Sequence, residues 1–208
     1  MKKIFFTTFL AFLFMLIFAN KALVSADNYP FSAGLSVSGK MGINAAKVPD
    51  GIQNNPSLLK GVDFGVLGYL PMSEDSRTGL FVELGYTNTP FALKNYATNI
   101  TGHINQKLLT ISPYLLMSGF TIGLDFGFAL SKTVDPEVLI FTPMDNDINV
   151  NIRVGGMIPL HTSSIGTLNF IANATYSLTG LQYLQTAYTY QPSTLSIGLN
   201  YLFNLEGF

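Results

Sequence analysis

Hydrophobic residues recur at every second position along most of the chain after residue 30. Between residues 31 and 44, apolar residues and Gly alternate with Ser, Gly, Lys and Asn. Successive side chains of a β-strand point to opposite faces, so this pattern predicts a strand with one apolar face and one small or polar face. The same period returns seven more times, at about residues 61–70, 78–87, 106–117, 120–131, 148–158, 167–177 and 194–203. Eight strands are therefore predicted, although Pro113 weakens the fourth because proline removes a ladder donor.

The residues on the polar faces decide between a soluble and a membrane fold. They are mainly Gly, Ser, Thr and Asn, and only 11% of the chain is charged while 48% is hydrophobic. Small polar residues suit the interior of a membrane barrel, and strands of about ten residues can cross a bilayer when tilted. An open sheet would leave edge groups unpaired in lipid. The sequence predicts an all-β, eight-stranded antiparallel transmembrane β-barrel, with a soluble β-sandwich or lipocalin-like carrier as an alternative.

The first residues have the pattern of a secretory signal peptide. Lys2 and Lys3 precede an apolar run over residues 4–18, and residues 24–26 are small enough for cleavage after Ala26. The apolar run is shorter than the roughly 20 residues that a membrane-spanning helix needs. We therefore expect a cleaved signal peptide rather than a retained anchor.

Cleavage would divide the chain into a signal peptide, residues 1–26, and one barrel domain, residues 27–208. The domain keeps eight of the eleven basic residues against twelve acidic ones, a net charge of about −4, so we expect no nucleic-acid partner. The absence of Cys excludes disulfides and thiolate chemistry. Neither a cofactor nor a metal is expected.

The connections between the predicted strands alternate in length. The long ones cover residues 45–60, 88–105, 132–147 and 179–192, and the short ones cover residues 71–77, 118–119 and 159–166. In outer-membrane barrels the short turns face the periplasm and the long loops face outside. Both termini are therefore expected on the periplasmic side, with four long loops outside.

This pattern, over residues 31–208, resembles the OmpA-like and OmpX-like small outer-membrane barrels. The resemblance implies a monomer in the cell outer membrane of a diderm bacterium, surrounded by lipid and by lipopolysaccharide or its equivalent. Barrels of this type commonly end in Phe on a last strand that the barrel-assembly machinery reads, as this chain ends in Phe208. Phe208 is out of phase with Tyr201 and Phe203, which predicts a bulge near Gly207 or an end that leaves the strand.

Five charged residues fall on the inward-facing phase: Lys40, Asp63, Glu83, Asp125 and Arg153. Buried charges are costly unless they are paired and hydrogen-bonded. We expect a cluster of Glu83, Asp125 and Arg153 near mid-height, in which Asp125 and Arg153 lie on neighbouring strands. Lys40 and Asp63 should lie nearer the outer mouth. Such a cluster can fill the lumen structurally or line a narrow conduction path.

Other polar residues offer weaker signals for chemistry. His161 and Ser163 form an H-x-S triplet that looks like the His and Ser pair of outer-membrane lipid A deacylases, but here it lies in a periplasmic turn. His103 has no second ligand with metal-binding spacing. Residues 145–147 (Asp-Asn-Asp) lack the Gly and terminal Glu of an EF-hand loop. The loop aromatics are expected in an interfacial girdle or a contact surface: Phe91, Tyr96, Tyr183, Tyr188 and Tyr190.

Three functions remain open on this basis. The first is a structural or surface-interaction role, with the extracellular loops contacting a ligand outside the cell. The second is a narrow pore for small solutes, because a lumen of Gly, Ser and Asn with few large side chains leaves a wet path. The third is a lipid-modifying enzyme. The sequence favours the first, a protein that is not an enzyme.

Overall fold

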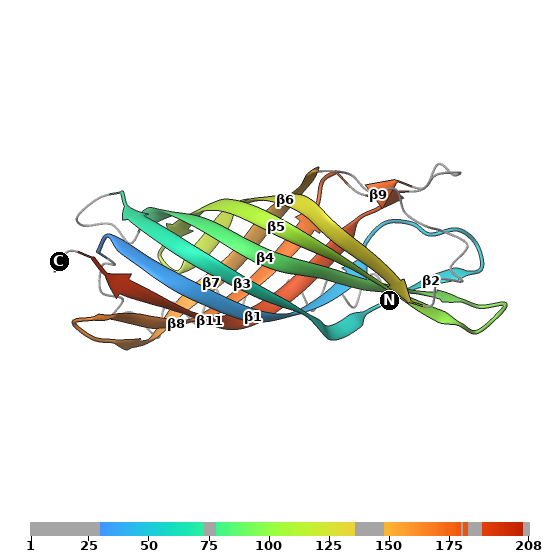
Figure 1. The fold of residues 1–208 in the computed structure, drawn as a ribbon, viewed down its shortest axis with the longest axis horizontal. Coiled ribbons are helices and arrows are strands. Elements are labelled where there is room, and N and C mark those ends of the chain that lie inside the picture. Colours follow the sequence, from blue (N-terminus) through green and yellow to red (C-terminus); the bar gives the residue numbers. More distant parts are fainter. Residues whose placement is uncertain (1–29, 73–77, 136–147, 180, 183–188, 206–208) are drawn as a thin grey trace.

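The computed structural model describes residues 30–72, 78–135, 148–179, 181–182 and 189–205, and in them eight long antiparallel strands form one closed ring (Figure 1). Those ranges contain no helix that is long and apolar enough to span a membrane. Because the first long strand pairs with the last, the eight long strands close into a ring, and the predicted eight-stranded antiparallel barrel is confirmed. The ring consists of β1 (Ser32–Asn44), β3 (Ser57–Pro71), β4 (Thr78–Asn95), β5 (Thr101–Met117), β6 (Phe120–Asp135), β7 (Ile148–Thr162), β8 (Gly166–Ser177) and β11 (Pro192–Asn204).

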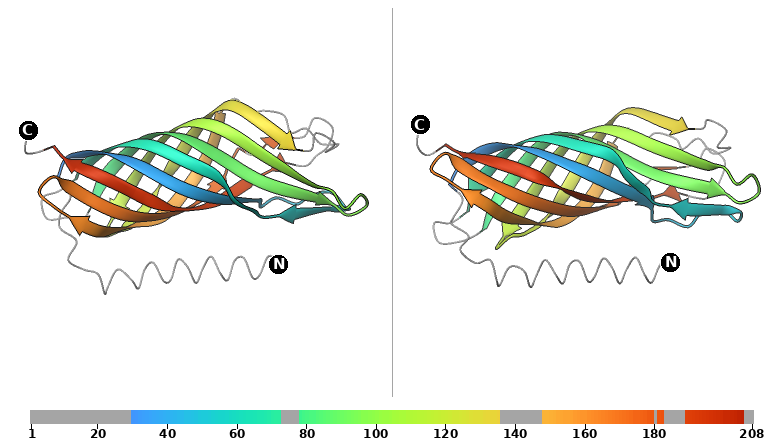
Figure 2. Two further views of the ribbon diagram at one scale, coloured as in Figure 1. Left: turned by 60° about the horizontal axis from the view of Figure 1, so that its bottom comes forward. Right: turned by 90° about the horizontal axis from the view of Figure 1, so that it is seen from below.

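The register of the ring shows how steeply the strands tilt. Starting at Ser32, register partners on each strand in turn lead back to β1 at Gly42, ten residues further along. A displacement of this kind is what closes a sheet into a barrel with tilted strands, and Figure 2 shows the tilt from two sides. Eight strands leave an interior just wide enough for side chains.

The two faces of the barrel differ as the alternation predicts. Outward side chains are apolar and exposed, for example Leu35 at 57% on β1 and Leu130 at 58% on β6. The inward residues between them are buried, including Lys40 at 5% and Asn200 at 3%. An apolar outside and a largely polar inside are the reverse of a soluble domain and match a transmembrane barrel.

The two ends of the barrel are built differently (Figure 1). At one end, the turn end, β5 and β6 are joined by Ser118 and Gly119, which both have positive φ (49° and 87°), as a two-residue hairpin turn with the twist of the strands requires. At the other end, the loop end, two expectations need correction. The strands are 12 to 18 residues long rather than about ten. The predicted loop over residues 88–105 is mostly strand, because β4 and β5 pair as far as Lys94 and Thr101.

Short strands add to the loop end. β2 (Ile52–Asn55) pairs with the last residues of β4, so β2, β4 and β5 form a three-stranded sheet that projects beyond the ring (Figure 2). β9 (Leu181–Gln182) and β10 (Thr189–Tyr190) form a separate pair. An apolar cluster lies under these elements, made by Phe91, Leu93, Ile104 and Tyr190 with Val48 and Ile52 packed against it. In the residues that the structure describes, the loop end is therefore folded structure rather than a set of open loops.

Candidate functional site in the barrel lumen

The half of the lumen next to the turn end is filled by apolar side chains. Three of their rings are register neighbours on β3, β4 and β5. The ring centroids of Tyr69 and Phe81 are 4.7 Å apart, and Phe81 stacks on Tyr114 at 4.9 Å. The expectation of a water-filled path between small residues is therefore wrong for this half of the lumen. We call this set the apolar plug: Leu67, Tyr69, Phe81, Tyr114, Leu116, Met157, Ile171 and Leu202, each at most 7% exposed.

Gly123 lies between the apolar plug and the charged residues on its loop-end side. Gly123 is the register partner of Tyr114 on one side and of Arg153 on the other. A Cβ at Gly123 would lie 2.3 Å from the carbonyl oxygen of Pro113 and 2.4 Å from Cβ of Tyr114. Without that side chain, the Arg153 guanidinium carbon lies 4.5 Å from the centre of the Tyr114 ring, a cation–π contact.

Arg153 is held by two carboxylates from different strands. Its Nη1 atom donates to Oε2 of Glu83 at 2.7 Å and lies 3.7 Å from Oδ1 of Asp125. Ser36 donates to the other Glu83 oxygen at 2.6 Å. The structure thus brings Glu83, Asp125 and Arg153 together, but the shortest ion pair crosses the lumen from β7 to β4 rather than joining the neighbouring strands β6 and β7.

Lys40 and Asp63 form a second ion pair, closer to the loop end. Nζ of Lys40 lies 2.8 Å from Oδ2 of Asp63 and donates to the Thr87 hydroxyl at 2.6 Å. The Thr87 hydroxyl donates in turn to Oδ1 of Asp63. Each partner of this pair therefore has hydrogen-bonding neighbours, as a buried ion pair requires.

A small polar cavity of about 40 Å³ connects the two ion-pair groups. It is lined by all five charged residues, so two cationic groups face three carboxylates. Oδ1 of Asp125 and Nε of Arg153 are buried without a hydrogen-bond partner.

The cavity lies between two apolar layers, with the apolar plug toward the turn end and the cluster around Phe91 and Tyr190 toward the loop end. No group of His, Cys, Asp or Glu in the described part of the chain is arranged to hold a metal ion. Two cationic side chains therefore face three carboxyl groups around this cavity.

The remaining candidate residues do not assemble into a reactive site. His161 lies exposed near the end of β7, and the Ser163 hydroxyl donates to the Gly166 carbonyl oxygen at 3.1 Å within the turn. Both lie at the turn end, away from the loop end where the lipid A deacylase analogy would need them. His103 lies on the outward phase of β5, with Nδ1 buried and unpartnered. The signal peptide, residues 145–147, Tyr183, Tyr188 and the C-terminal Phe208 fall outside the described residues.

The loop-end cluster and the apolar plug are both features that the expectations from the sequence did not include. Phe91 and Tyr190, expected in a girdle or contact surface, are 0% and 1% exposed in the loop-end cluster, while Tyr96 is 61% exposed in the β4–β5 turn. The sequence contains a signal for the loop-end cluster, because Phe91 and Leu93 continue the inward phase of β4 beyond Thr87. The apolar plug is likewise visible as an excess of large residues on the inward phase near the short turns.

No protein-family model matches the chain, and no curated protein sequence matches it. Among solved structures, the outer membrane protein AlkL aligns with a TM-score of 0.46 at 14% identity. The alignment covers 88% of this chain and 94% of the AlkL chain. OprG from Pseudomonas aeruginosa has a TM-score of 0.40 at 10% identity, covering 85% and 98%. Ail of Yersinia pestis has a TM-score of 0.39 at 10% identity, covering 85% and 100%.

The membrane location follows from the chain's own structure. In a closed ring each long strand pairs with a neighbour on both sides, as lipid requires, and the exposed outward side chains are apolar around the ring. Closed barrels with this division of faces span outer membranes. The protein is an outer-membrane β-barrel.

Proposed function

We propose that the protein is a sealed outer-membrane barrel with a structural or surface-interaction role, in which the barrel holds a folded extracellular end in place. The short turns would face the periplasm and the sheet of β2, β4 and β5 would face outside, as in the OmpA-like and OmpX-like barrels. The surrounding partners would be lipid and lipopolysaccharide or its equivalent, and the barrel-assembly machinery would insert the chain. No enzymatic step is part of this proposal.

The observation that carries the proposal is the apolar plug. Phe81 and Leu116 are 0% and 1% exposed, and packing this dense leaves no room for hydrated solutes. A protein that moved solutes along its axis would need these side chains to part. The folded loop end supports the other half of the proposal, because ordered sheet with the exposed Tyr96 at its tip can present a fixed surface.

A narrow pore is the second candidate, favoured by the polar cavity with its five charges. The test is planar-bilayer conductance of the refolded mature protein, after heat-modifiable gel migration and β-rich circular dichroism have shown that it is folded. We expect a folded and silent barrel. Discrete conductance steps whose ion selectivity changes in Glu83→Gln, but not in Ile152→Ala on the lipid-facing side, would replace our proposal with the pore.

A further inference from the structure

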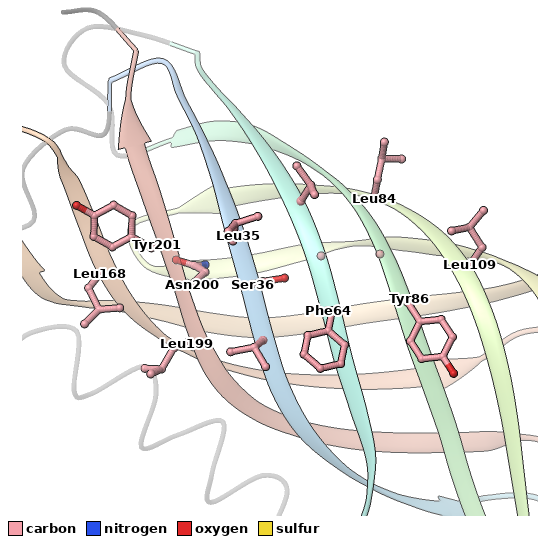
Figure 3. Close-up of a pocket in the computed structure, with 14 residues that line it drawn as sticks. Leu35, Ser36, Phe64, Leu84, Tyr86, Leu109, Leu168, Leu199, Asn200 and Tyr201 are labelled. Carbon is pink, nitrogen blue, oxygen red and sulfur yellow. The ribbon is translucent and has the colours of Figure 1, made fainter.

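The surroundings of β4 change where this strand last pairs with β3. That row joins Phe64 and Tyr86, which Figure 3 shows side by side on the outer surface. Toward the turn end from there, outward residues of β4 are exposed, as Leu84 is at 55%. Toward the loop end, the next three residues on the same phase are buried: Asn88, Pro90 and Ala92. Protein rather than lipid therefore covers this part of β4.

The inner faces of β1 and β3 provide part of that cover. Gly42 continues the inward phase of β1 after Lys40, and a Cβ on Gly42 would overlap the carbonyl oxygen of Pro90. A Cβ on Gly61, the register partner of Lys40 on β3, would lie only 3.1 Å from Cδ of Pro90. β4 also contacts β11, although β3 and β1 lie between them in the ring. This part of β4 therefore crosses the loop end of the lumen instead of following the wall.

Asn44 ties β4 to the far side of the lumen through β2. Nδ2 of Asn44 donates to Oδ1 of Asn54 on β2 at 2.9 Å, and Oδ1 of Asn44 accepts from the backbone N–H of Gln191 at 2.8 Å. Nδ2 of Asn54 donates to the carbonyl oxygen of Ala46 at 3.0 Å. Since β2 pairs with β4, these bonds hold β4 to the end of β1 and the beginning of β11. Asn44 itself is 1% exposed.

Both outer edges of the β4–β5 pair are interrupted near one row, which joins Thr87 and Leu108. On the β4 edge, the ladder with β3 ends one residue earlier, at Tyr86. On the β5 edge, the register with β6 shifts between Lys107 and Leu108. Beyond the shift, residues 131–135 of β6 pair with β5 and, within the described residues, with no other strand. Bulged and interrupted ladders bend locally, so this row is where the two strands bend most easily.

Hydrogen bonds fix β4 at this same row. The Thr87 hydroxyl accepts from Nζ of Lys40 at 2.6 Å. In the next residue, Nδ2 of Asn88 donates to the carbonyl oxygen of Val62 at 2.8 Å. Because these bonds lie within one residue of the row, they hold the base of the β4–β5 pair and allow the part beyond them to bend.

We propose that residues 88–107, with β2 attached, form a strap that closes the loop end of the lumen and lifts about this row. In the closed state Pro90 packs on the two glycines beside Lys40, and the Asn44 bonds hold the strap down. Lifting opens the polar cavity toward the loop end while the apolar plug stays in place. The lumen is thereby reached from one side without a path through the barrel, which goes beyond the structural role proposed above.

The closed state is the more stable one. Lifting the strap separates Phe91 from Tyr190, whose ring centroids are 5.4 Å apart in the loop-end cluster, and breaks the bonds of Asn44. Local openings of this kind occur with a free energy below that of global unfolding. The open state is therefore a minor one in the wild type, and weakening the closed contacts should make it more frequent.

The test uses the absence of Cys from the chain. Ser196→Cys places one thiol in the wall of the polar cavity, at a position that is 7% exposed. Thr121→Cys places the thiol next to Leu116 of the apolar plug, at a position that is 3% exposed, and is the matched reporter for the other half. The refolded barrel is treated with a small charged methanethiosulfonate reagent, and mass spectrometry follows the rate of modification. Gel migration confirms that each variant is folded.

Two further changes, each combined with a reporter, release the strap in different ways. Asn44→Ala removes the bonds to Asn54 and Gln191, and Gly42→Ala places a Cβ where Pro90 lies. Gly68→Ala is the matched control, because its Cβ would lie 4.0 Å from the nearest atom of a neighbouring strand.

We expect Asn44→Ala and Gly42→Ala each to raise the modification rate of Ser196→Cys by about tenfold, and Gly68→Ala to leave it unchanged. The rate of Thr121→Cys should stay the same in all three. An unchanged rate of Ser196→Cys in Asn44→Ala would show that the strap does not close the lumen, even if Gly42→Ala failed to fold. A parallel rise at Thr121→Cys would mean that the whole barrel loosens. Either result would overturn the proposal.

Discussion

The two halves of the lumen have the same alternation of side chains but are stabilised by different interactions. Toward the turn end, inward positions carry the apolar plug, whose members contact one another over wide surfaces. Toward the loop end, inward positions carry Lys40, Asp63 and Thr87, in which each polar group depends on a particular partner. The comparison shows that packing stabilises the barrel interior where it is apolar, and that ion pairs with hydrogen-bonding neighbours stabilise it where it is charged. The two halves should therefore respond differently to substitution.

Arg153 lies at the border between the halves, and its replacement should have the largest effect. Arg153→Met leaves the buried Glu83 and Asp125 carboxylates without their cation and removes the contact with Tyr114. We expect a loss of about 3 to 5 kcal/mol in the free energy of unfolding, measured by denaturant titration in vesicles. Adding Glu83→Leu should recover part of that loss. If Arg153→Met alone unfolded like the wild type, the charged cluster would have no structural role.

Within the apolar plug, neighbouring leucines on β5 offer a matched pair. Leu116 is 1% exposed and points inward, while Leu115 is 36% exposed and points to lipid. Leu116→Ala should cost about 2 to 5 kcal/mol because it removes buried contacts and leaves a cavity, whereas Leu115→Ala should cost much less. The readout is the same denaturant titration. Similar losses in both variants would contradict the assignment of this half to packing.

The smallest effect is expected at the ion pair nearer the loop end. Asp63→Asn keeps the shape of the side chain but removes the charge that faces Lys40, and part of this carboxylate is already in contact with solvent. We expect a loss of about 1 to 2 kcal/mol in unfolding free energy. Asp50→Asn, at an exposed position outside the ring, should be neutral. A loss as large as that in Arg153→Met would show that both ion pairs are equally buried in solution.

The sequence predicts the ring well because each strand contains its own evidence. Period-two alternation tells the inward side chain from the outward one, as Leu35 and Ser36 illustrate, and connection length tells one end from the other. The pattern also places five charges in the lumen. It does not tell which charges meet, because the tilt of the ring displaces the register by ten residues per turn. That displacement lets Arg153 reach Glu83 across the lumen.

The features that were not predicted depend on two segments at once. The inward phase of β4 continues through Phe91 and Leu93, but only its pairing with β2 and β5 shows that this stretch is sheet rather than loop. The break in the β3–β4 ladder beyond Phe64 and Tyr86 is likewise invisible along either strand, because it exists only where the partner of β4 changes from β3 to β2. The sequence pattern shows which side chains of a strand face inward. It does not show which strand each strand pairs with.

The contact between β1 and β11 has a consequence for assembly. These two strands lie at opposite ends of the described chain and are register partners at every residue from Ser32 to Asn44. The ring therefore closes only after the last strand has been delivered, and until then β1 and β8 each present an unpaired edge. Pairing between such distant segments is slow, and an unpaired edge in lipid is costly. A chain that stopped before Pro192 would be an open sheet, so insertion into the membrane and completion of the chain are coupled.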